Sequence, residues 1–208
     1  MIETVSLIGF AGASLAVALS PGASWMYVIS HAVGQGSAGS RAAIAGNATG
    51  ILGHTVMAAL GLSALVAYSA SVYTVLRWLG ALYLIYLAVR TVRSPSPFAK
   101  GIEGAAPIPA FTNFKRGVVM NLLNPKVAVL MVALLPQFIN PETLPVYPQI
   151  VLLGSMHALI ASIVLSILAT IVGRAAPILY NSPRLERVFR WFSGGVLFAF
   201  GTRTALDV

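Results

Sequence analysis

The sequence predicts an all-α integral membrane protein in which six transmembrane helices form two inverted three-helix repeats, with helices 1 and 4 broken at Pro21 and Pro125. Composition gives the first reason, because 58% of the 208 residues are hydrophobic and 9% are charged, whereas a soluble domain carries roughly 25% charged residues. The second reason is a series of apolar stretches close to the ~20 residues that a spanning helix needs. The third is a proline break followed by a histidine, a pair that occurs twice in the same order.

The apolar stretches divide into five long segments and one weaker segment near the C-terminus. Arg203 interrupts the weaker segment, but Arg190 at its start can extend toward the membrane surface and so lengthen it. Glu3 is the only charged residue before the first apolar run, so we expect a retained span rather than a secretory signal, which would open with positive charge. The expected spans cover residues 4–30, 42–69, 72–89, 117–140, 146–173 and about 188–206.

Lysine and arginine residues gather in alternate loops. Arg41 follows the first span, and larger groups lie between spans three and four and between spans five and six, whereas the opposite loops carry only Glu142. Arg77 and Arg203, each near a helix end, are the exceptions. The positive-inside rule therefore places both termini outside and the basic loops in the cytosol. Orientation explains the net charge of +8 better than nucleic-acid binding does, and the basic loops also suit anionic lipid heads.

A long loop rich in proline and glycine separates two halves of similar plan. Pro21 and Pro125 are 104 residues apart, His54 follows Pro21 by 33 positions, and His157 follows Pro125 by 32. Because each half has three spans, the second would enter the membrane upside down, which is a common transporter plan with its site at the midplane. Chance similarity of spacing is the alternative. The expected division is 1–94 for the first three-helix repeat, 95–116 for a cytosolic loop and 117–208 for the second repeat.

The two breaks have the chemistry of restarted helices. Ser20-Pro21-Gly22 and Asn124-Pro125-Lys126 each place a favoured N-cap residue before a proline, which is itself favoured at the first helical position. A restarted helix presents free N–H groups and the positive end of its dipole, and such an end attracts carboxylates. Within a membrane it must face protein or a water-filled cavity. Simple proline kinks without a site are the alternative.

Lys126 lies about ten residues from the cytosolic end of its span, roughly 15 Å deep at 1.5 Å per residue. A lysine at that depth costs about 2.5–3.5 kcal/mol, so we expect it to face a cavity or a partner. Since every acidic residue falls in a loop or at a terminus, we infer that the partner is the cargo, most simply a carboxylate. A lysine that extends to the cytosolic face or pairs with carbonyls and water is the alternative. The acidic residues are Glu3, Glu103, Glu142, Glu186 and Asp207.

Other polar groups are expected around Lys126. Asn121 shares a helical face with Asn124, and Asn47 and His54 lie along one face of the second span. Histidine titrates near neutrality and is suited to carry a coupled proton, and a buried lysine releases its own more readily; hydrogen-bonded packing is the alternative role for either histidine. The expected substrate-binding residues are Ser20, Pro21, Gly22, Asn47, His54, Asn121, Asn124, Pro125 and Lys126, and the proton-coupling candidates are His54, His157 and Lys126.

The segments "ALSPGASWMYVIS", "GNATGILGHTVMAALGLSALV" and "FKRGVVMNLLNPKVAVLMVALLPQFI" together resemble the lysine-exporter superfamily, in its homoserine/threonine efflux branch. The likeness runs from about residue 10 to 140. It implies a six-span exporter of amino acids or close derivatives in the bacterial inner membrane, driven by the proton gradient. The family's first motif usually reads Pro-Gly-Pro, whereas here it reads Pro21-Gly22-Ala23, and the Asn124-Pro125-Lys126 motif is intact.

The resulting prediction is a secondary transporter that exports amino acids or related small carboxylate metabolites, and not an enzyme. An uncoupled small-molecule channel and a haem-binding redox protein that uses His54 and His157 are the alternatives. Hydrolase motifs of the GxSxG or HExxH type are absent from the sequence. No cofactor or metal is expected, because the spans lack Asp, Glu and Cys. Glycine-rich faces suit packing within one chain or between two, so a homodimer stays open.

Overall fold

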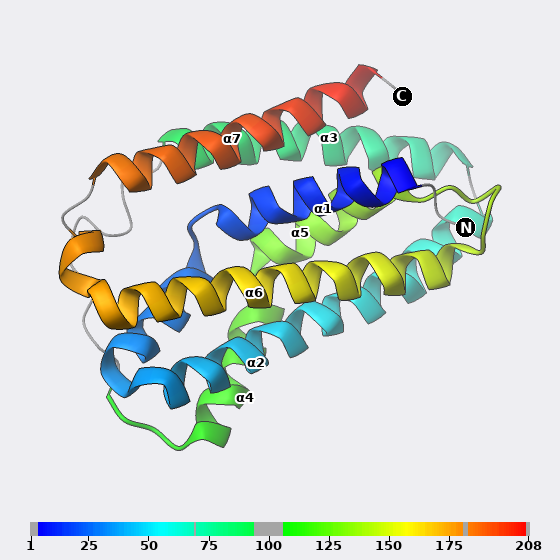
Figure 1. Ribbon diagram of the computed structural model, residues 1–208. Coiled ribbons are helices and arrows are strands. Elements are labelled where there is room, and N and C mark those ends of the chain that lie inside the picture. Colours follow the sequence, from blue (N-terminus) through cyan, green and yellow to red (C-terminus); the bar gives the residue numbers. More distant parts are fainter. Residues whose placement is uncertain (1–3, 69, 94–105, 181–182, 207–208) are drawn as a thin grey trace.

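The computed structural model describes residues 4–68, 70–93, 106–180 and 183–206, and every element in those ranges is helical (Figure 1). This confirms the prediction of an all-α chain for the described part. The elements are α1 Thr4–Leu19, α2 Ala23–Tyr68, α3 Ala70–Arg93, α4 Ala110–Leu122, α5 Pro125–Leu134, the 3₁₀ helix η1 Leu135–Phe138, α6 Val146–Tyr180 and α7 Pro183–Leu206.

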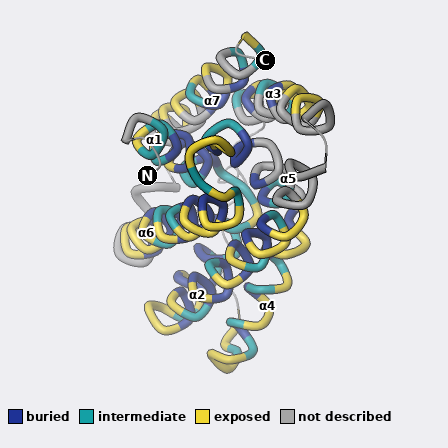
Figure 2. Tube along the Cα trace, turned by 90° about the vertical axis from the view of Figure 1, so that its right-hand side faces the viewer, coloured by how far each residue is buried: buried dark blue, intermediate teal, exposed yellow. Residues whose placement is uncertain are grey.

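The helices form an elongated bundle with two outer groups and a centre. α3 packs along α7 on one side, and α2 packs against α6 and α4 on the other. α1 and α5 lie between these groups, where α1 contacts α6 and α7 and α5 contacts α3 (Figures 1 and 2). α1 begins and α7 ends at the same end of the bundle. The central position of α1 and α5 brings the segments that precede α2 and α5 to the middle of the molecule.

Residues 31–41, expected between the first and second spans, belong to the 46-residue α2. The helix changes direction at Gly36, whose φ of 66° and ψ of −152° fall in a region that is essentially restricted to glycine. No proline interrupts this stretch, so the helical hydrogen bonding resumes at once on the far side of Gly36. The polar composition of residues 31–41 predicted a loop. The structure instead changes the direction of the chain at the single residue Gly36.

The second half begins earlier than expected. α4 starts at Ala110 directly after Pro109, so residues 110–116 are helical rather than part of the connecting loop. Asn124 then caps α5: its backbone is extended, and its side chain accepts a hydrogen bond from the backbone N–H of Lys126 at 3.1 Å. Pro125 occupies the first turn, where its missing N–H is harmless.

Glycines let the helices approach closely around the centre. Gly46 on α2 and Gly117 on α4 face each other, and a Cβ at Gly117 would lie 3.2 Å from the Gly46 Cα. A Cβ at Gly50 would lie 2.5 Å from the Asn121 Cβ. At Gly154 of α6, a Cβ would overlap Thr55 of α2. These contacts hold α4 and α6 against α2, so that the polar groups of all three meet.

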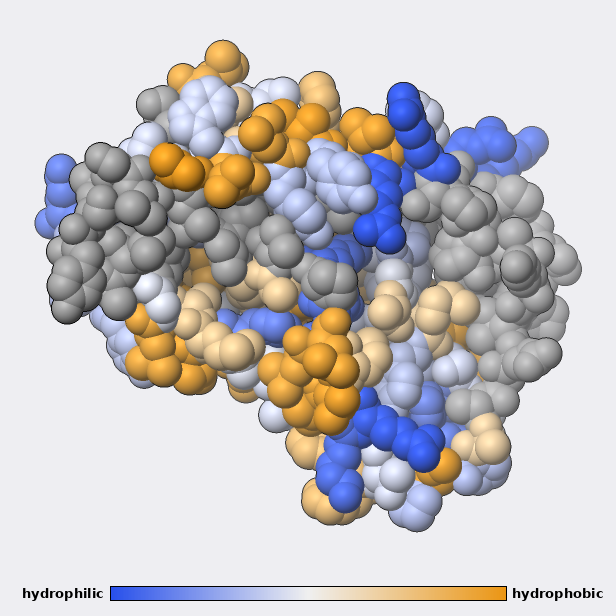
Figure 3. Space-filling model, turned by 180° about the vertical axis from the view of Figure 1, so that it is seen from behind, coloured by the Kyte–Doolittle hydropathy of each residue, from blue (hydrophilic) through white to orange (hydrophobic). Residues whose placement is uncertain are grey.

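The outward faces are apolar. Leu60 is 65% exposed, Leu82 58% and Leu159 61%, and Figure 3 shows hydrophobic side chains spread over the rear face, with hydrophilic ones in smaller groups and in a central hollow. Two of the described helices contain stretches long and apolar enough to cross a membrane, Ala23–Gly61 and Val146–Val172. Large apolar side chains exposed on several helices suit a lipid environment.

Candidate functional site

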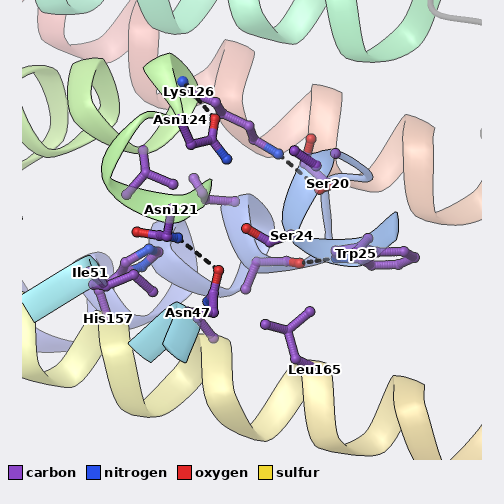
Figure 4. Close-up of a pocket in the computed structure, with 16 residues that line it drawn as sticks. Ser20, Ser24, Trp25, Asn47, Ile51, Asn121, Asn124, Lys126, His157 and Leu165 are labelled. Carbon is purple, nitrogen blue, oxygen red and sulfur yellow. Dashed lines mark hydrogen bonds between the residues drawn. The ribbon is translucent and has the colours of Figure 1, made fainter. Parts of the chain in front are cut away.

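The two predicted break segments meet at Lys126. Its ammonium donates a hydrogen bond to the backbone carbonyl of Ser20, with Nζ and the oxygen 2.8 Å apart (Figure 4). A Cβ at Gly22 would lie 3.5 Å from the same nitrogen, in ordinary van der Waals contact, so Gly22 borders the ammonium. The lysine thus connects the start of α5 with residues 20–22, the segment between α1 and α2.

Lys126 has no carboxylate partner among the residues that the structure describes. Glu142 is exposed and lies between η1 and α6, and the side chains of the other four acids fall outside the described part. A carbonyl oxygen supplies a hydrogen bond but no compensating charge. A hydrogen bond to a carbonyl is one of the alternatives that the sequence left open for Lys126. This bond holds the ammonium between the two break segments.

A second cation stands nearby. α3 extends to Arg93, so Arg90, which was expected just beyond the third span, lies on the helix. Its positive charge is close enough to act on the ammonium of Lys126. Arg90 is exposed, so the positive charge within the site itself is that of Lys126.

A cavity of about 50 Å³ opens between the breaks and α6. That volume holds a few water molecules but is below the roughly 300–1,000 Å³ of most small-molecule sites. Of the expected site residues, Pro21 and His54 do not line the cavity, and the Pro125 side chain lies outside the described part. The expected residues that line it are Ser20, Gly22, Asn47, Asn121, Asn124, Lys126 and His157.

Two asparagines bridge the halves of the chain at this cavity. The amide of Asn121 donates to Oδ1 of Asn47 at 2.7 Å (Figure 4), and both side chains are buried. Asn121 Oδ1 is buried and has no hydrogen-bond partner within the described part of the chain. A buried polar atom left unpaired costs about 1–3 kcal/mol. Asn121 therefore carries a hydrogen-bonding capacity that the fold does not use.

The two histidines make reciprocal contacts with the opposite half. His157 Nδ1 and the hydroxyl of Ser14 on α1 form a buried hydrogen bond of 2.5 Å. His54 Nε2 is hydrogen-bonded to the backbone carbonyl of Asn121 on α4 at 3.1 Å. Of the two, only His157 lines the cavity. Ser166 and Thr170, polar residues on the other side of the same helix, are exposed, so α6 turns His157 and not these two residues inward.

Sequence reasoning missed two serines at this site. Ser14 was not singled out, because a serine within an apolar helix gives no signal. Ser24, the second residue of α2, lines the cavity. Trp25 also lines it and donates from its indole nitrogen to the Ala18 carbonyl at 2.7 Å, across the break.

Comparison with known proteins identifies the relatives of this chain. A family model described as LysE type translocator matches residues 15–207. The uncharacterized membrane protein YrhP of Bacillus subtilis is 33% identical over 97% of this chain and 99% of its own length. The homoserine/homoserine lactone efflux protein of Salmonella typhi is 32% identical over 89% of this chain and 88% of its own. The leucine efflux protein of Salmonella choleraesuis is 27% identical over 60% and 58%, respectively. No solved structure matches the chain.

These relatives confirm the resemblance seen in the break motifs, including its amino-acid efflux branch. They also confirm a membrane protein and a transporter in place of an enzyme or a redox protein. The family match covers both break segments and all the residues of the cavity. The chain belongs to the LysE type translocator family.

Proposed function

We propose that the chain exports amino acids or related small carboxylate metabolites across the bacterial inner membrane as a secondary transporter, and that Lys126 binds the cargo carboxylate. The observation that carries this proposal is the Lys126 ammonium, which sits between two helix breaks with only a carbonyl as its described partner. Two relatives named for the efflux of homoserine and of leucine support the cargo class.

The cargo carboxylate would compete with the Ser20 carbonyl for the ammonium. Both bonds have an ionised donor, but a carboxylate adds the attraction between opposite charges, so the acid has the advantage once it reaches the site. Lys126 lies in the first turn of α5, where the helix dipole is positive and favours an anion. Asn121 has a free amide oxygen that suits the ammonium of an amino acid after a small rotation of its side chain.

Export requires the cavity to widen and to open on each side in turn. We infer that the helices form two inverted three-span repeats, 1–94 and 110–208, joined by a cytosolic connection before α4. The breaks at Pro21 and Pro125 are then equivalent points in the two repeats. The reciprocal contacts of His54 and His157 with the opposite half support this symmetry. Both termini would be periplasmic, in keeping with α1 beginning and α7 ending at one end of the bundle.

For the coupled proton we favour His157 over His54. His157 lines the cavity beside Lys126 and shares a hydrogen bond with a serine hydroxyl, which can either donate or accept and so tolerates both protonation states. His54 is bonded to a backbone carbonyl, which can only accept, and it does not line the cavity. Its contact is that of a packing residue.

Counterflow in proteoliposomes tests the carboxylate site. Vesicles loaded with unlabelled homoserine or leucine should take up the labelled amino acid, and Lys126→Ala should reduce the rate about 10- to 100-fold, the loss expected for one hydrogen bond to a charged group. Lys115→Ala is the matched control, since Lys115 is an exposed lysine over the Phe111 ring and should transport like the parent. Equal transport by Lys126→Ala and the parent would overturn the proposal.

A further inference from the structure

A second cavity lies far from the break segments, in a groove between α3 and α7. Its volume is about 330 Å³, and apart from Arg93 every residue that lines it is apolar. None of these residues lines the cavity at Lys126. The groove therefore has a separate chemistry, and the cargo site does not account for it.

Adjacent glycines on α7 produce the groove. A Cβ at Gly194 would lie 2.5 Å from a methyl carbon of Val92 and 3.2 Å from the carbonyl of Ala88, so its absence lets α7 approach α3. Gly195 faces open space with no atom within 4 Å of an added Cβ. Because α7 contacts α3 closely at Gly194 and has no neighbour at Gly195, a hollow remains beside the backbone of Gly195.

Aromatic side chains flank this hollow along α7. Trp191 is 59% exposed and Phe198 49% exposed, and both line the groove. Seven residues of helix separate them, about 10 Å at 1.5 Å per residue, which fits within the roughly 15 Å of one leaflet of the hydrocarbon core. The groove has the length and the polarity of a site for one acyl chain.

Arg93 defines the charge at the end of the groove. It is exposed and is the last residue of α3, and tryptophan and arginine are residues typical of the membrane–water interface. We propose that the groove binds one acyl chain of an anionic phospholipid, with the phosphate of its headgroup at Arg93. The positive guanidinium complements the phosphate in charge, and it can bond two phosphate oxygens at once.

A lipid suits this groove better than a second copy of the chain. In a two-fold dimer the same patch meets itself, so the Arg93 residues of two copies would approach each other as like charges. The convex face of a helix from a second copy would leave part of the concave groove unfilled, whereas a flexible acyl chain can adopt the shape of the groove. Both features favour a single flexible apolar chain with an anionic end.

Quenching of Trp191 fluorescence by brominated lipids tests the proposal. We use the Trp78→Phe variant, in which the buried Trp25 and the exposed Trp191 are the remaining tryptophans. The variant is placed in phosphatidylcholine nanodiscs. Brominated phosphatidylglycerol should reach half-maximal quenching at a mole fraction about fivefold lower than brominated phosphatidylcholine, the preference expected for one basic residue at an anionic surface. Arg93→Gln should remove that preference.

A groove-filling variant separates the acyl chain from the headgroup. At Gly195 an added Cβ meets no atom within 4 Å, so Gly195→Leu places its side chain in the hollow and should abolish saturable quenching by both lipids. Gly12→Leu, at another glycine with equally open space around its Cβ, should leave the quenching intact. Quenching that follows only the bulk mole fraction of brominated lipid would overturn the proposal. So would a dimer that Gly195→Leu dissociates while quenching stays unchanged, because the groove would then be a protein interface. None of these outcomes depends on transport, so they do not bear on the cargo site.

Discussion

At the scale of single residues, the polar centre combines features that a sequence can and cannot reveal. Asn124 caps α5 in the way that its place before a proline predicts, and Lys126 stands out because no acid shares its span. Ser14 gives no such signal, since a serine in an alanine-rich helix is ordinary. Its bond to His157 joins residues 143 positions apart and depends on how α6 packs against α1, which no local pattern encodes.

The difference between the two histidines gives a prediction at this scale. His157→Gln keeps a side chain that can hydrogen-bond but removes the titrating ring, so we expect a pH gradient no longer to drive uptake into inverted vesicles while counterflow persists. His54→Gln should keep the response to the gradient, because His54 bonds a backbone carbonyl away from the cavity. The measurement is gradient-driven uptake divided by counterflow for each variant. A His157→Gln protein with an unchanged ratio would assign the proton to another group.

At the scale of elements, the helices themselves were largely predictable and their ends were not. Hydropathy placed all the long helices, but the polar stretch after residue 30 concealed that helix extends up to Gly36 and resumes directly after it. Hydrogen bonding within a helix does not require apolar residues, so composition alone could not distinguish this helix from a loop. The proline positions were more informative because proline lacks an N–H group.

Gly36 provides the test at this scale. Its conformation is strained for any residue with a Cβ, so Gly36→Ala should lower the free energy of unfolding by about 1–3 kcal/mol, although no neighbouring atom blocks the added methyl. Gly12→Ala is the control, because Gly12 lies within α1 with equally open space, and alanine there should stabilise the helix by roughly 0.5–1 kcal/mol. Thermal unfolding in detergent measures both. A Gly36→Ala variant as stable as the parent would mean that the reversal tolerates other backbone angles.

At the scale of the whole molecule, composition was sufficient to predict a membrane protein, and the paired motifs were sufficient to predict the family. Small residues at 46–50 favour close approach of another helix, but that α4 is the partner could not be predicted in the same way. It depends on Gly46 and Gly117 meeting across the two halves, and many glycines in this chain could have served equally well. The sequence thus predicts which groups are polar and central, while packing decides which of them touch.

Topology is testable with single cysteines, because the chain has none of its own. Glu142→Cys and Lys115→Cys replace exposed residues in the regions assigned to opposite sides of the membrane. In intact cells a membrane-impermeant maleimide should label Glu142→Cys, and it should label Lys115→Cys only after the inner membrane is permeabilised. Labelling of both from one side would exclude the proposed orientation.

The hydrogen bond from Lys126 to the Ser20 carbonyl also bears on the behaviour of the exporter between turnovers. The ammonium has three N–H donors, but an incoming acid attracts it more strongly than a neutral carbonyl does, so we expect arrival of the acid to loosen the link between the two helix breaks. Without a bound acid, the protein would keep its two break segments linked by this hydrogen bond. Such an exporter should pass few protons when no amino acid is bound, and the proton gradient of the cell would be used only in completed transport cycles.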